Sequence, residues 1–474
     1  MAVAPAPVTG DALAAQGRDM AAQRQAEAEP LGEVLSLDEA MARALKYNLD
    51  HRTKLLEEAL ALNLLDVTKF DLLPKLMAEA GYNWRSNDRI SLSRDTTNPG
   101  SPLLPSRFIS QERSHTTADL GLSWNLLDFG LGYYASKQQA DRVLVALEKR
   151  RKAMHLLLQD VRIAYWRLTS AQLLENKLQT AMAKAEEALT DARRVEEGRW
   201  RDPADAMRFQ RQILENLRIL EAVRQELATA ELELAKLINA PAGQTLRVSL
   251  PDDRGDVADL LGRNAEELEE LALRQNPDLR MYHYETRIAR LEARRGIACL
   301  FPNLNLSYSL NYDSDRYLAN NHWNQVGARL GYNLLSIASY RQVKAYGKTG
   351  VALAEERALA THMAVLAQLH LSRIQLAQTA QQLLRARELR DVDQRLAELI
   401  TNREKAATQS QLELVSAETA AILSELRYYQ AVAQVQAAEA RLTAVIGAEP
   451  DIPALDEISL ADLAGLMRSG WSRP

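Results

Sequence analysis

Two glycine-containing stretches of the sequence have residue types that bind nucleotide phosphates. Residues 347–349 read GKT, as at the end of a phosphate-binding loop, but Gln342 stands where the upstream glycine is required. Residues 130–132 read GLG and precede Ala135, which resembles a dinucleotide-binding fingerprint after a strand. No strand–helix–strand unit follows, and both stretches run into long helical patterns. We therefore expect neither stretch to bind a nucleotide.

Side chains that act as metal ligands or nucleophiles are scattered along the chain. His362 and His370 share one predicted helix but lie about two turns apart, too far for joint zinc ligation, and no HExxH sequence is present. Cys299 is the only cysteine, so neither an internal disulfide nor a cysteine-rich metal site is expected. No serine stands in a GxSxG sequence. The sequence predicts a protein that is not an enzyme, with no catalytic residue, cofactor or metal.

Charge and hydropathy narrow the class of protein further. The net charge of −5 comes from 58 basic and 63 acidic residues, which are spread along all 474 positions. A nucleic-acid-binding protein would gather its basic residues on one face, so no nucleic-acid partner is expected. No window approaches 18 uninterrupted apolar residues, so the sequence predicts no transmembrane helix.

The first 34 residues differ in composition from the rest of the chain. Residues 1–34 are rich in Ala, Pro and Gln, which favours an extended or disordered lead. Residues 1–30 lack the basic and apolar regions of a secretory signal. The sequence therefore predicts either a cytoplasmic protein or one whose signal peptide lies outside this sequence.

Four segments alternate strictly between apolar and polar residues. The clearest is NLNLSYSLNYD at residues 303–313. The apolar positions are Leu76, Ala78, Ala80, Tyr82 and Trp84; Ala118, Leu120, Leu122, Trp124 and Leu126; Leu304, Leu306, Tyr308, Leu310 and Tyr312; and Val326, Ala328, Leu330, Tyr332 and Leu334. A two-residue period over about ten residues is typical of a strand with one apolar face. We predict four strands, in hairpins over 75–127 and 303–335, each with a polar, turn-rich loop between its strands.

The sequence also contains two related halves. Pairs 228 positions apart are Asn48 with Asn276 and Pro74 with Pro302, and pairs 208 positions apart are Asn125 with Asn333 and Leu237 with Val445. The change of spacing indicates that the second copy lacks about 20 residues between its two strands. The pattern predicts a tandem duplication of roughly 200 residues, each copy with a helix, a hairpin and two long helices.

Two very long helices are predicted, over residues 131–194 and 340–402. Both are built from Ala, Leu, Gln, Glu, Arg and Lys without proline, which are strong helix formers. Gly347 and Gly350 weaken the second helix locally. A helix of this size is roughly 100 Å long, and its recurring alanines favour close, coiled-coil packing.

The strands separate two interpretations of the chain. Four strands divided by long helices are too few to cover both faces of a soluble sandwich. A sheet in hydrocarbon must close on itself, because open edges leave backbone groups without hydrogen-bond partners. Four strands cannot close a barrel, but several chains that each contribute four strands can, with apolar residues toward lipid and polar residues toward a lumen.

In this arrangement the chain resembles the TolC-like outer-membrane factor family, from about residue 35 to 450. The motifs that carry the resemblance are LSLDEAMARALKYN at 35–48, NPDLR at 276–280, the junctions at Pro74 and Pro302, and WNLLDFG at 124–130. The resemblance implies an α+β membrane protein that forms a homotrimer. Three copies share a twelve-stranded barrel in the bacterial outer membrane, which continues into an α-helical periplasmic tunnel with an equatorial domain.

The family's function implies that the chain is a passive exit duct in contact with outer-membrane lipid. It works with a periplasmic adaptor protein and with an inner-membrane pump or ABC transporter. The cargo stays open, because both tripartite efflux and type I protein secretion occur in this family. The expected parts are a lead at 1–34, repeat 1 at 35–240 with a helical hairpin at 130–240, an equatorial linker at 241–263, repeat 2 at 264–448 with a helical hairpin at 339–448, and a C-terminal equatorial segment at 449–474.

The family resemblance places adaptor docking at two turns between long helices. In the first turn, Gly198 matches a glycine of the family, and Arg199 and Trp200 follow it. In the second turn, Ala406 occupies the equivalent position, followed by Ala407 and Thr408. The missing glycine weakens the match at the second turn.

Acidic residues that face the tunnel aperture in this family map to Glu413 and Ser416, so only one acid is kept here. Asp205 holds the corresponding place in the first repeat, and Arg403 is a candidate for ion pairs that hold the aperture closed. A ring of carboxylates at a constriction would select cations. A solvated helix face is the alternative for Glu413 and Asp205.

Two other functions fit parts of the pattern. A coiled-coil scaffold explains the long helices but leaves the four strands unexplained. A periplasmic adaptor has a single helical hairpin between two parts of a β-rich region, whereas this chain has two units of hairpin plus helices. Solubility without detergent would favour the scaffold.

Overall fold

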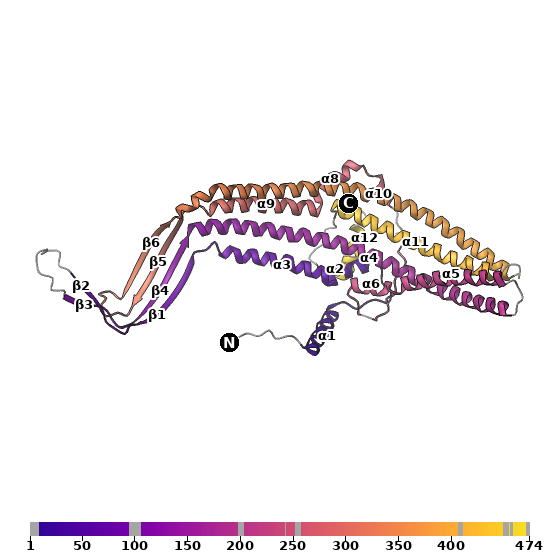
Figure 1. Cartoon of the computed structure of the whole chain (residues 1–474), viewed down its shortest axis with the longest axis horizontal. Helices are drawn as coiled ribbons and strands as arrows, with labels where there is room; N and C mark the ends of the chain where they lie inside the picture. The colour runs from indigo at the N-terminus through magenta and orange to yellow at the C-terminus, as the bar shows by residue number, and fades with distance from the viewer. Residues whose placement is uncertain are drawn as a thin grey trace. The chain divides into compact units, whose positions relative to one another are not determined.

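The computed structural model of the chain describes residues 9–93, 106–197, 203–241, 243–251, 257–405, 411–448, 455 and 458–470 (Figure 1). The chain divides into two compact units. Unit 1 consists of Met1–Glu57, Leu147–Met281 and Ala360–Pro474, and unit 2 consists of Glu58–Ala146 and Tyr282–Leu359.

Helices dominate the described residues. They are α1 (Gly10–Glu27), α2 (Leu37–Tyr47), α3 (Leu49–Phe70), α4 (Leu126–Glu197), α5 (Pro203–Ala228), α6 (Ala230–Leu237), α7 (Ala258–Gly262), α8 (Ala265–Gln275), α9 (Pro277–Ala298), the 3₁₀ helix η1 (Leu334–Ser339), α10 (Tyr340–Lys405), α11 (Gln411–Ile446) and α12 (Leu460–Gly470). Within this part of the chain, no helix has both the length and the apolar character that a membrane span requires.

The two predicted long helices are present as α4, with 72 residues, and α10, with 66. The glycines of α10 do not interrupt it. A side chain at Gly347 would place its Cβ 2.9 Å from the Cβ of Ala293 on α9. Within unit 2, this glycine therefore allows α10 to approach α9 more closely than any larger residue would.

Unit 2 contains the strands β1 (Lys75–Trp84), β2 (Arg89–Ser93), β3 (Ser106–Gln111), β4 (Ser114–Asn125), β5 (Asn303–Asp313) and β6 (His322–Gly331). Four of them form an antiparallel sheet in the order β1-β4-β5-β6. The predicted alternation is confirmed within the strands, since Leu76, Leu122, Tyr308 and Val326 form one row across the sheet. It was extended too far at Leu126, Tyr332 and Leu334, which lie beyond the ends of β4 and β6. One face of the sheet is apolar and the other is polar.

The segment between β1 and β4 differs from the prediction of a turn-rich loop. It contains a second, two-stranded sheet in which β2 pairs with β3. Ile90 lies opposite Ile109 in this pair, and Arg113 holds Asp88 through two hydrogen bonds of 2.7 and 2.9 Å at the base. An apolar cross-strand pair stabilises a hairpin, and this one was hidden among the polar residues around it.

The N-terminal lead also differs from the prediction. Residues 10–27 form α1 rather than an extended segment. Its Ala, Gln, Glu and Arg residues favour a helix, and no proline lies between Pro7 and Pro30.

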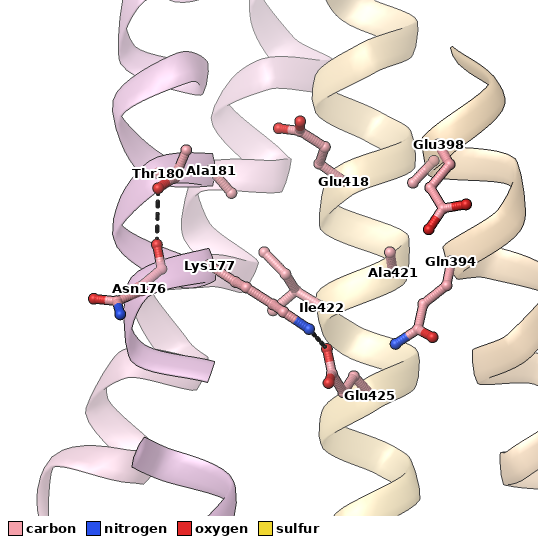
Figure 2. A pocket seen from close by; sticks show the side chains of 11 residues that line it. Asn176, Lys177, Thr180, Ala181, Gln394, Glu398, Glu418, Ala421, Ile422 and Glu425 are labelled. Atoms are coloured by element: carbon pink, nitrogen blue, oxygen red, sulfur yellow. Dashed lines mark hydrogen bonds and ion pairs between the residues drawn. The ribbon is translucent and has the colours of Figure 1, made fainter. Parts of the chain in front are cut away.

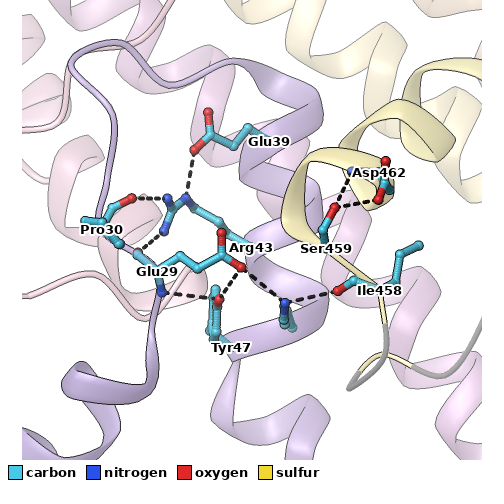
Figure 3. Close-up of polar contacts among 9 residues, drawn as sticks. Glu29, Pro30, Glu39, Arg43, Tyr47, Ile458, Ser459 and Asp462 are labelled. Carbon is cyan, nitrogen blue, oxygen red and sulfur yellow. Dashed lines mark hydrogen bonds and ion pairs between the residues drawn. The ribbon is translucent and has the colours of Figure 1, made fainter.

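In unit 1, α2 contacts two segments that are far apart in the sequence, residues 29–30 and residues 458–470. Arg43 is only 4% exposed and donates to the carbonyl oxygens of Glu29 and Pro30, at 2.8 and 2.6 Å (Figure 3). Lys46, one turn later, donates to the carbonyl oxygen of Ile458 at 3.1 Å, just before α12. Helix α12 packs on α2, with Leu463 fully buried. Basic side chains of α2 therefore fix both the segment that precedes α2 and the segment that precedes α12.

Two asparagines make equivalent contacts in unit 1. Asn48 Nδ2 donates to the carbonyl oxygen of Leu237 at 3.0 Å, and Asn276 Nδ2 donates to that of Val445 at 2.8 Å. The residues that follow these two helix ends, Asn239 and Gly447, both have positive φ, of 54° and 78°. Each asparagine thus satisfies a carbonyl that the end of a helix leaves unpaired.

Buried polar residues lie along α4 in unit 1, and one of them reaches the end of α11. Arg151 donates to Glu148 Oε2 at 2.6 Å and to the carbonyl oxygen of Gly447 at 3.1 Å. His155, one turn further along α4, is 3% exposed. Burial, and to a smaller extent the positive charge of Arg151, lower the pKa of His155 to about 4.

Gly447→Ala is expected to destabilise unit 1 by at least about 2 kcal/mol. The added Cβ would clash with the carbonyl oxygen of Gln275, at a φ of 78° that disfavours alanine. Gly465→Ala in α12 is the matched control, because a Cβ there meets nothing within 4 Å. Denaturant unfolding measures both, and equal midpoints would contradict the expected clash.

His155 should make stability fall as the pH is lowered. In the unfolded chain the histidine binds a proton near pH 6.5, whereas in the folded chain it does so only near pH 4. The free energy of unfolding is therefore highest above pH 6.5 and falls as the pH is lowered toward 4. The difference amounts to about 3 kcal/mol. His155→Leu should flatten the pH dependence of the free energy of unfolding between pH 7 and 4. An unchanged slope would show that the histidine does not titrate in this way.

Candidate functional site

Several predicted site residues lie outside the described part of the chain. These are the docking-turn residues Gly198, Arg199, Trp200, Ala406, Ala407 and Thr408. The backbone of Asp205 belongs to the first turn of α5, but its side chain is not described. Roles for these residues therefore stay predictions.

The other predicted aperture residues belong to the helices that flank the second turn. Glu413 lies in the first turn of α11 and is exposed, and Arg403 is exposed near the end of α10. Ser416 is half-buried, and its Oγ accepts a hydrogen bond of 3.3 Å from Asn216 of α5. Ser416 is thus used, at least in part, to hold α5 against α11.

Helix α11 is buried along most of its surface. Over residues 413–446, the exposed residues recur every seven positions, at Glu413, Ala420, Arg427, Gln434 and Arg441. Residues seven apart lie almost on the same side of an α-helix. Within residues 413–446, the predicted aperture acid Glu413 therefore begins an exposed stripe along α11.

A groove is formed in unit 1 by α4, α10 and α11, and we call it the lysine–glutamate groove (Figure 2). It encloses about 540 Å³. Its lining residues are Asn176, Lys177, Thr180 and Ala181 of α4, Gln394, Ala397 and Glu398 of α10, and Glu418, Ala421, Ile422 and Glu425 of α11. Alanines from all three helices keep its floor open between the longer polar side chains.

Two ion pairs connect α4 to α11 at this groove. Lys177 Nζ lies 2.6 Å from Glu425 Oε2, and Lys184 pairs with Glu418. Glu425 is 10% exposed and Glu418 is 19% exposed at the side chain, so both acids are more shielded than most surface carboxylates. The pairs fix the α4 wall of the groove relative to its floor.

An aromatic contact fixes the α10 wall. The guanidinium carbon of Arg390 lies 4.1 Å from the ring centroid of Tyr428 on α11, a cation–π distance. Arg390 also donates to Asp391, and this hydrogen bond lowers the pKa of the Asp391 carboxyl. Gln394 follows one turn later and enters the groove.

The sequence prediction did not include the lysine–glutamate groove. The signal was present, because Lys177 with Lys184 and Glu418 with Glu425 are each seven residues apart, so each pair shares one helix side. Matching the two pairs requires knowing that α4 lies against α11.

The polar face of the sheet in unit 2 carries a further row of functional side chains. Glu79, Asp119, Asn311 and Trp323 lie opposite one another on β1, β4, β5 and β6. With its amide group oriented to satisfy both neighbours, Asn311 donates to Asp119 Oδ1 at 2.9 Å and accepts from Trp323 Nε1 at 3.2 Å. The polar face is thus ordered by side-chain hydrogen bonds as well as by the backbone.

Comparison with known proteins identifies the fold. No protein-family model matches the chain, and no curated protein sequence matches it significantly. Among solved structures, the chain is similar to the outer-membrane channel OprN, with 17% identity and a TM-score of 0.64 over 87% of this chain and 89% of OprN.

Two further solved structures are similar over comparable lengths. The CmeC outer-membrane channel of Campylobacter jejuni has 13% identity and a TM-score of 0.66 over 92% of this chain and 89% of CmeC. The open state of the MtrE outer-membrane channel of Neisseria gonorrhoeae has 17% identity and a TM-score of 0.63 over 87% of this chain and 88% of MtrE. The chain has the fold of these outer-membrane channels.

Proposed function

We propose that the chain is a member of the TolC-like outer-membrane factor family and acts as a passive export duct. Three copies form a twelve-stranded barrel in the bacterial outer membrane and a helical tunnel in the periplasm. The fold shared with OprN, CmeC and MtrE supports this proposal. The strongest support is the sheet of unit 2, which has unpaired edges, one apolar face and one polar face.

The sheet has two edges and one apolar face that need partners. Strands β1 and β6 form the edges, and among the described strands none pairs with their outer sides. On the apolar face, Val326 is 80% exposed, Leu330 is 69% exposed and Leu76 is 67% exposed. Because successive strands are antiparallel, β6 of one copy can pair with β1 of the next without breaking the alternation. Three copies then remove every edge.

The helices carry apolar side chains that a neighbouring copy would cover. Exposed examples are Leu56, Leu60 and Val67 of α3 and Leu389, Val392 and Leu399 of α10. Many exposed apolar residues along a helix favour burial against another chain. They support a homotrimer in which helices as well as strands meet.

We further propose that the chain arose by tandem duplication. The supporting contacts are the paired asparagine bonds of Asn48 and Asn276 and the positive φ angles of Asn239 and Gly447. Asn125 and Asn333 add a third pair, since each side-chain oxygen accepts from the backbone N–H two residues later.

The duct would export cargo in a tripartite efflux system or a type I secretion system. In this proposal Glu413, with Asp205, lines the periplasmic aperture, and Ser416 and Arg403 stabilise its closed state. The turns at 198–200 and 406–408 dock a periplasmic adaptor, and the lysine–glutamate groove offers a helix of that adaptor a polar, alanine-floored surface. An inner-membrane pump or ABC transporter would supply the energy.

Substitutions at two adjacent β6 residues should distinguish a barrel from a coiled-coil scaffold. Val326 belongs to the apolar face and Gln325 to the polar face. In a barrel, Val326→Arg costs about 2–4 kcal/mol if it faces the middle of the membrane and should prevent insertion, whereas Gln325→Arg should fold and change the conductance. Fractionation and heat-modifiable gel mobility test this. If the wild type and both variants stay out of the membrane fraction, the scaffold is favoured.

Glu413→Gln should reduce the cation selectivity of the channel. A ring of three carboxylates attracts cations at a constriction, and the substitution removes its charge while keeping the side-chain shape. The reversal potential in a salt gradient across a planar bilayer measures the effect, with Gln434→Glu as a control for added charge elsewhere on the same helix stripe. If selectivity is unchanged in Glu413→Gln, the aperture lies elsewhere.

A further inference from the structure

A second groove in unit 1 lies between α5 and α11, and we call it the arginine groove. It encloses about 500 Å³, within the range of roughly 300–1,000 Å³ typical of sites for small organic molecules. Its lining residues are Arg218, Ile219, Ala222, Val223 and Glu226 of α5 and Leu423, Leu426, Arg427 and Gln430 of α11. It shares no lining residue with the lysine–glutamate groove.

The floor of the arginine groove is apolar and firmly packed. Val223 is 5% exposed and Leu426 is 4% exposed, and both belong to one buried cluster with Leu220 and Ile422. Ala222 is exposed above this floor and leaves room where a larger side chain would fill the groove. A flat apolar body can therefore rest on a surface that does not need to rearrange.

The charged side chains along the groove differ in whether another side chain pairs with them. Arg218 pairs with Glu215 at 2.6 Å, and Glu226 Oε1 accepts a hydrogen bond of 2.8 Å from Gln430 Nε2. Arg427 is exposed, and within the described part of the chain it has neither an ion pair nor a hydrogen bond. One guanidinium beside the apolar floor is therefore available to an anionic group.

The position of Arg427 connects the groove to the proposed duct. Arg427 belongs to the exposed stripe of α11 that begins at Glu413, fourteen residues earlier. Fourteen residues are close to four helical turns, so both side chains leave α11 on nearly the same side. If Glu413 lines the aperture, the arginine groove opens into the same lumen.

We propose that the arginine groove binds amphipathic organic anions of drug size as they pass through the duct. The apolar body lies on Val223 and Leu426, and the anionic group pairs with the guanidinium of Arg427. This inference rests on the proposed export function and adds the class of cargo to it. Electrostatics then favours anions over cations of the same shape, and Glu226 opposes the anion from the end of the groove.

Naphthalene-2-sulfonate is a suitable probe, with 2-naphthylmethylammonium as the cation of similar shape. The probe is added to the wild-type channel in a planar bilayer, and its dissociation constant is obtained from the concentration dependence of current block. Arg427→Gln should weaken block by the anion roughly five-fold, as for loss of an exposed ion pair. Glu226→Gln should strengthen it, and Ala222→Trp should abolish it by filling the groove.

Arg441→Gln is the matched control, because Arg441 lies on the same stripe but outside the groove. Its block by the anion should equal that of the wild type. Equal block by anion and cation, or equal effects of Arg427→Gln and Arg441→Gln, would overturn the proposed site.

A protein that forms no channel would contradict the proposed function but would still allow the site to be tested. In that case, equilibrium dialysis of radiolabelled naphthalene-2-sulfonate compares the purified wild-type protein with Arg427→Gln in the same detergent. Tighter binding to the wild type would support the groove as a site, and identical binding would reject it.

Discussion

The requirement that every backbone N–H and C=O in hydrocarbon has a partner governs the proposed assembly. One copy supplies four antiparallel strands with unpaired edges at β1 and β6. Four strands are too few to close, so in the proposed assembly other copies of the chain satisfy the edges. In the proposed barrel, the apolar face that includes Val326 and Leu76 would lie toward lipid and the polar face toward a lumen. In this proposal, the closed barrel and the alternation of apolar and polar residues both follow from placing the sheet in hydrocarbon.

The helical part of the chain meets a different constraint, because very long helices must pack closely over many turns. Gly347 against Ala293 shows how far small residues reduce the separation between α10 and α9. Asn48, Asn276 and Gly447 show how the ends of such helices are satisfied without interrupting their neighbours. Arg151 of α4, which is buried, donates to the carbonyl oxygen of Gly447 and so joins α4 to the end of α11. The lysine–glutamate groove and the arginine groove both form where α11 packs against its neighbouring helices.

Local patterns predicted local structure well. The two-residue period of 303–313 identified β5 and its apolar face, and the absence of proline over 131–194 and 340–402 identified α4 and α10. Composition was misleading for residues 10–27, where alanine-rich helix formers were interpreted as an extended lead. The β2–β3 hairpin was missed because its apolar pair is short and surrounded by polar residues.

The grooves could not be predicted from the sequence because each needs side chains from helices distant in the chain. Lys177 meets Glu425 across 248 positions, and Glu226 meets Gln430 across 204. Each side chain alone is typical of a solvated helix face. Only the pairing of α11 with α4 and α5 brings these residues together in grooves.

Cross-linking between copies tests the closure of the sheet most directly. With Cys299 replaced by serine, one cysteine is placed at Ala80 on β1 and a second at Asn324, Val326, Ala328 or Leu330 on β6, and a short thiol-reactive cross-linker is added to membranes. The proposed pairing of β6 with the next copy's β1 predicts a covalent trimer at one or two adjacent β6 positions and none at the others. The absence of any cross-linked species across the panel, or a ladder that stops at dimers, would contradict a barrel shared by three copies.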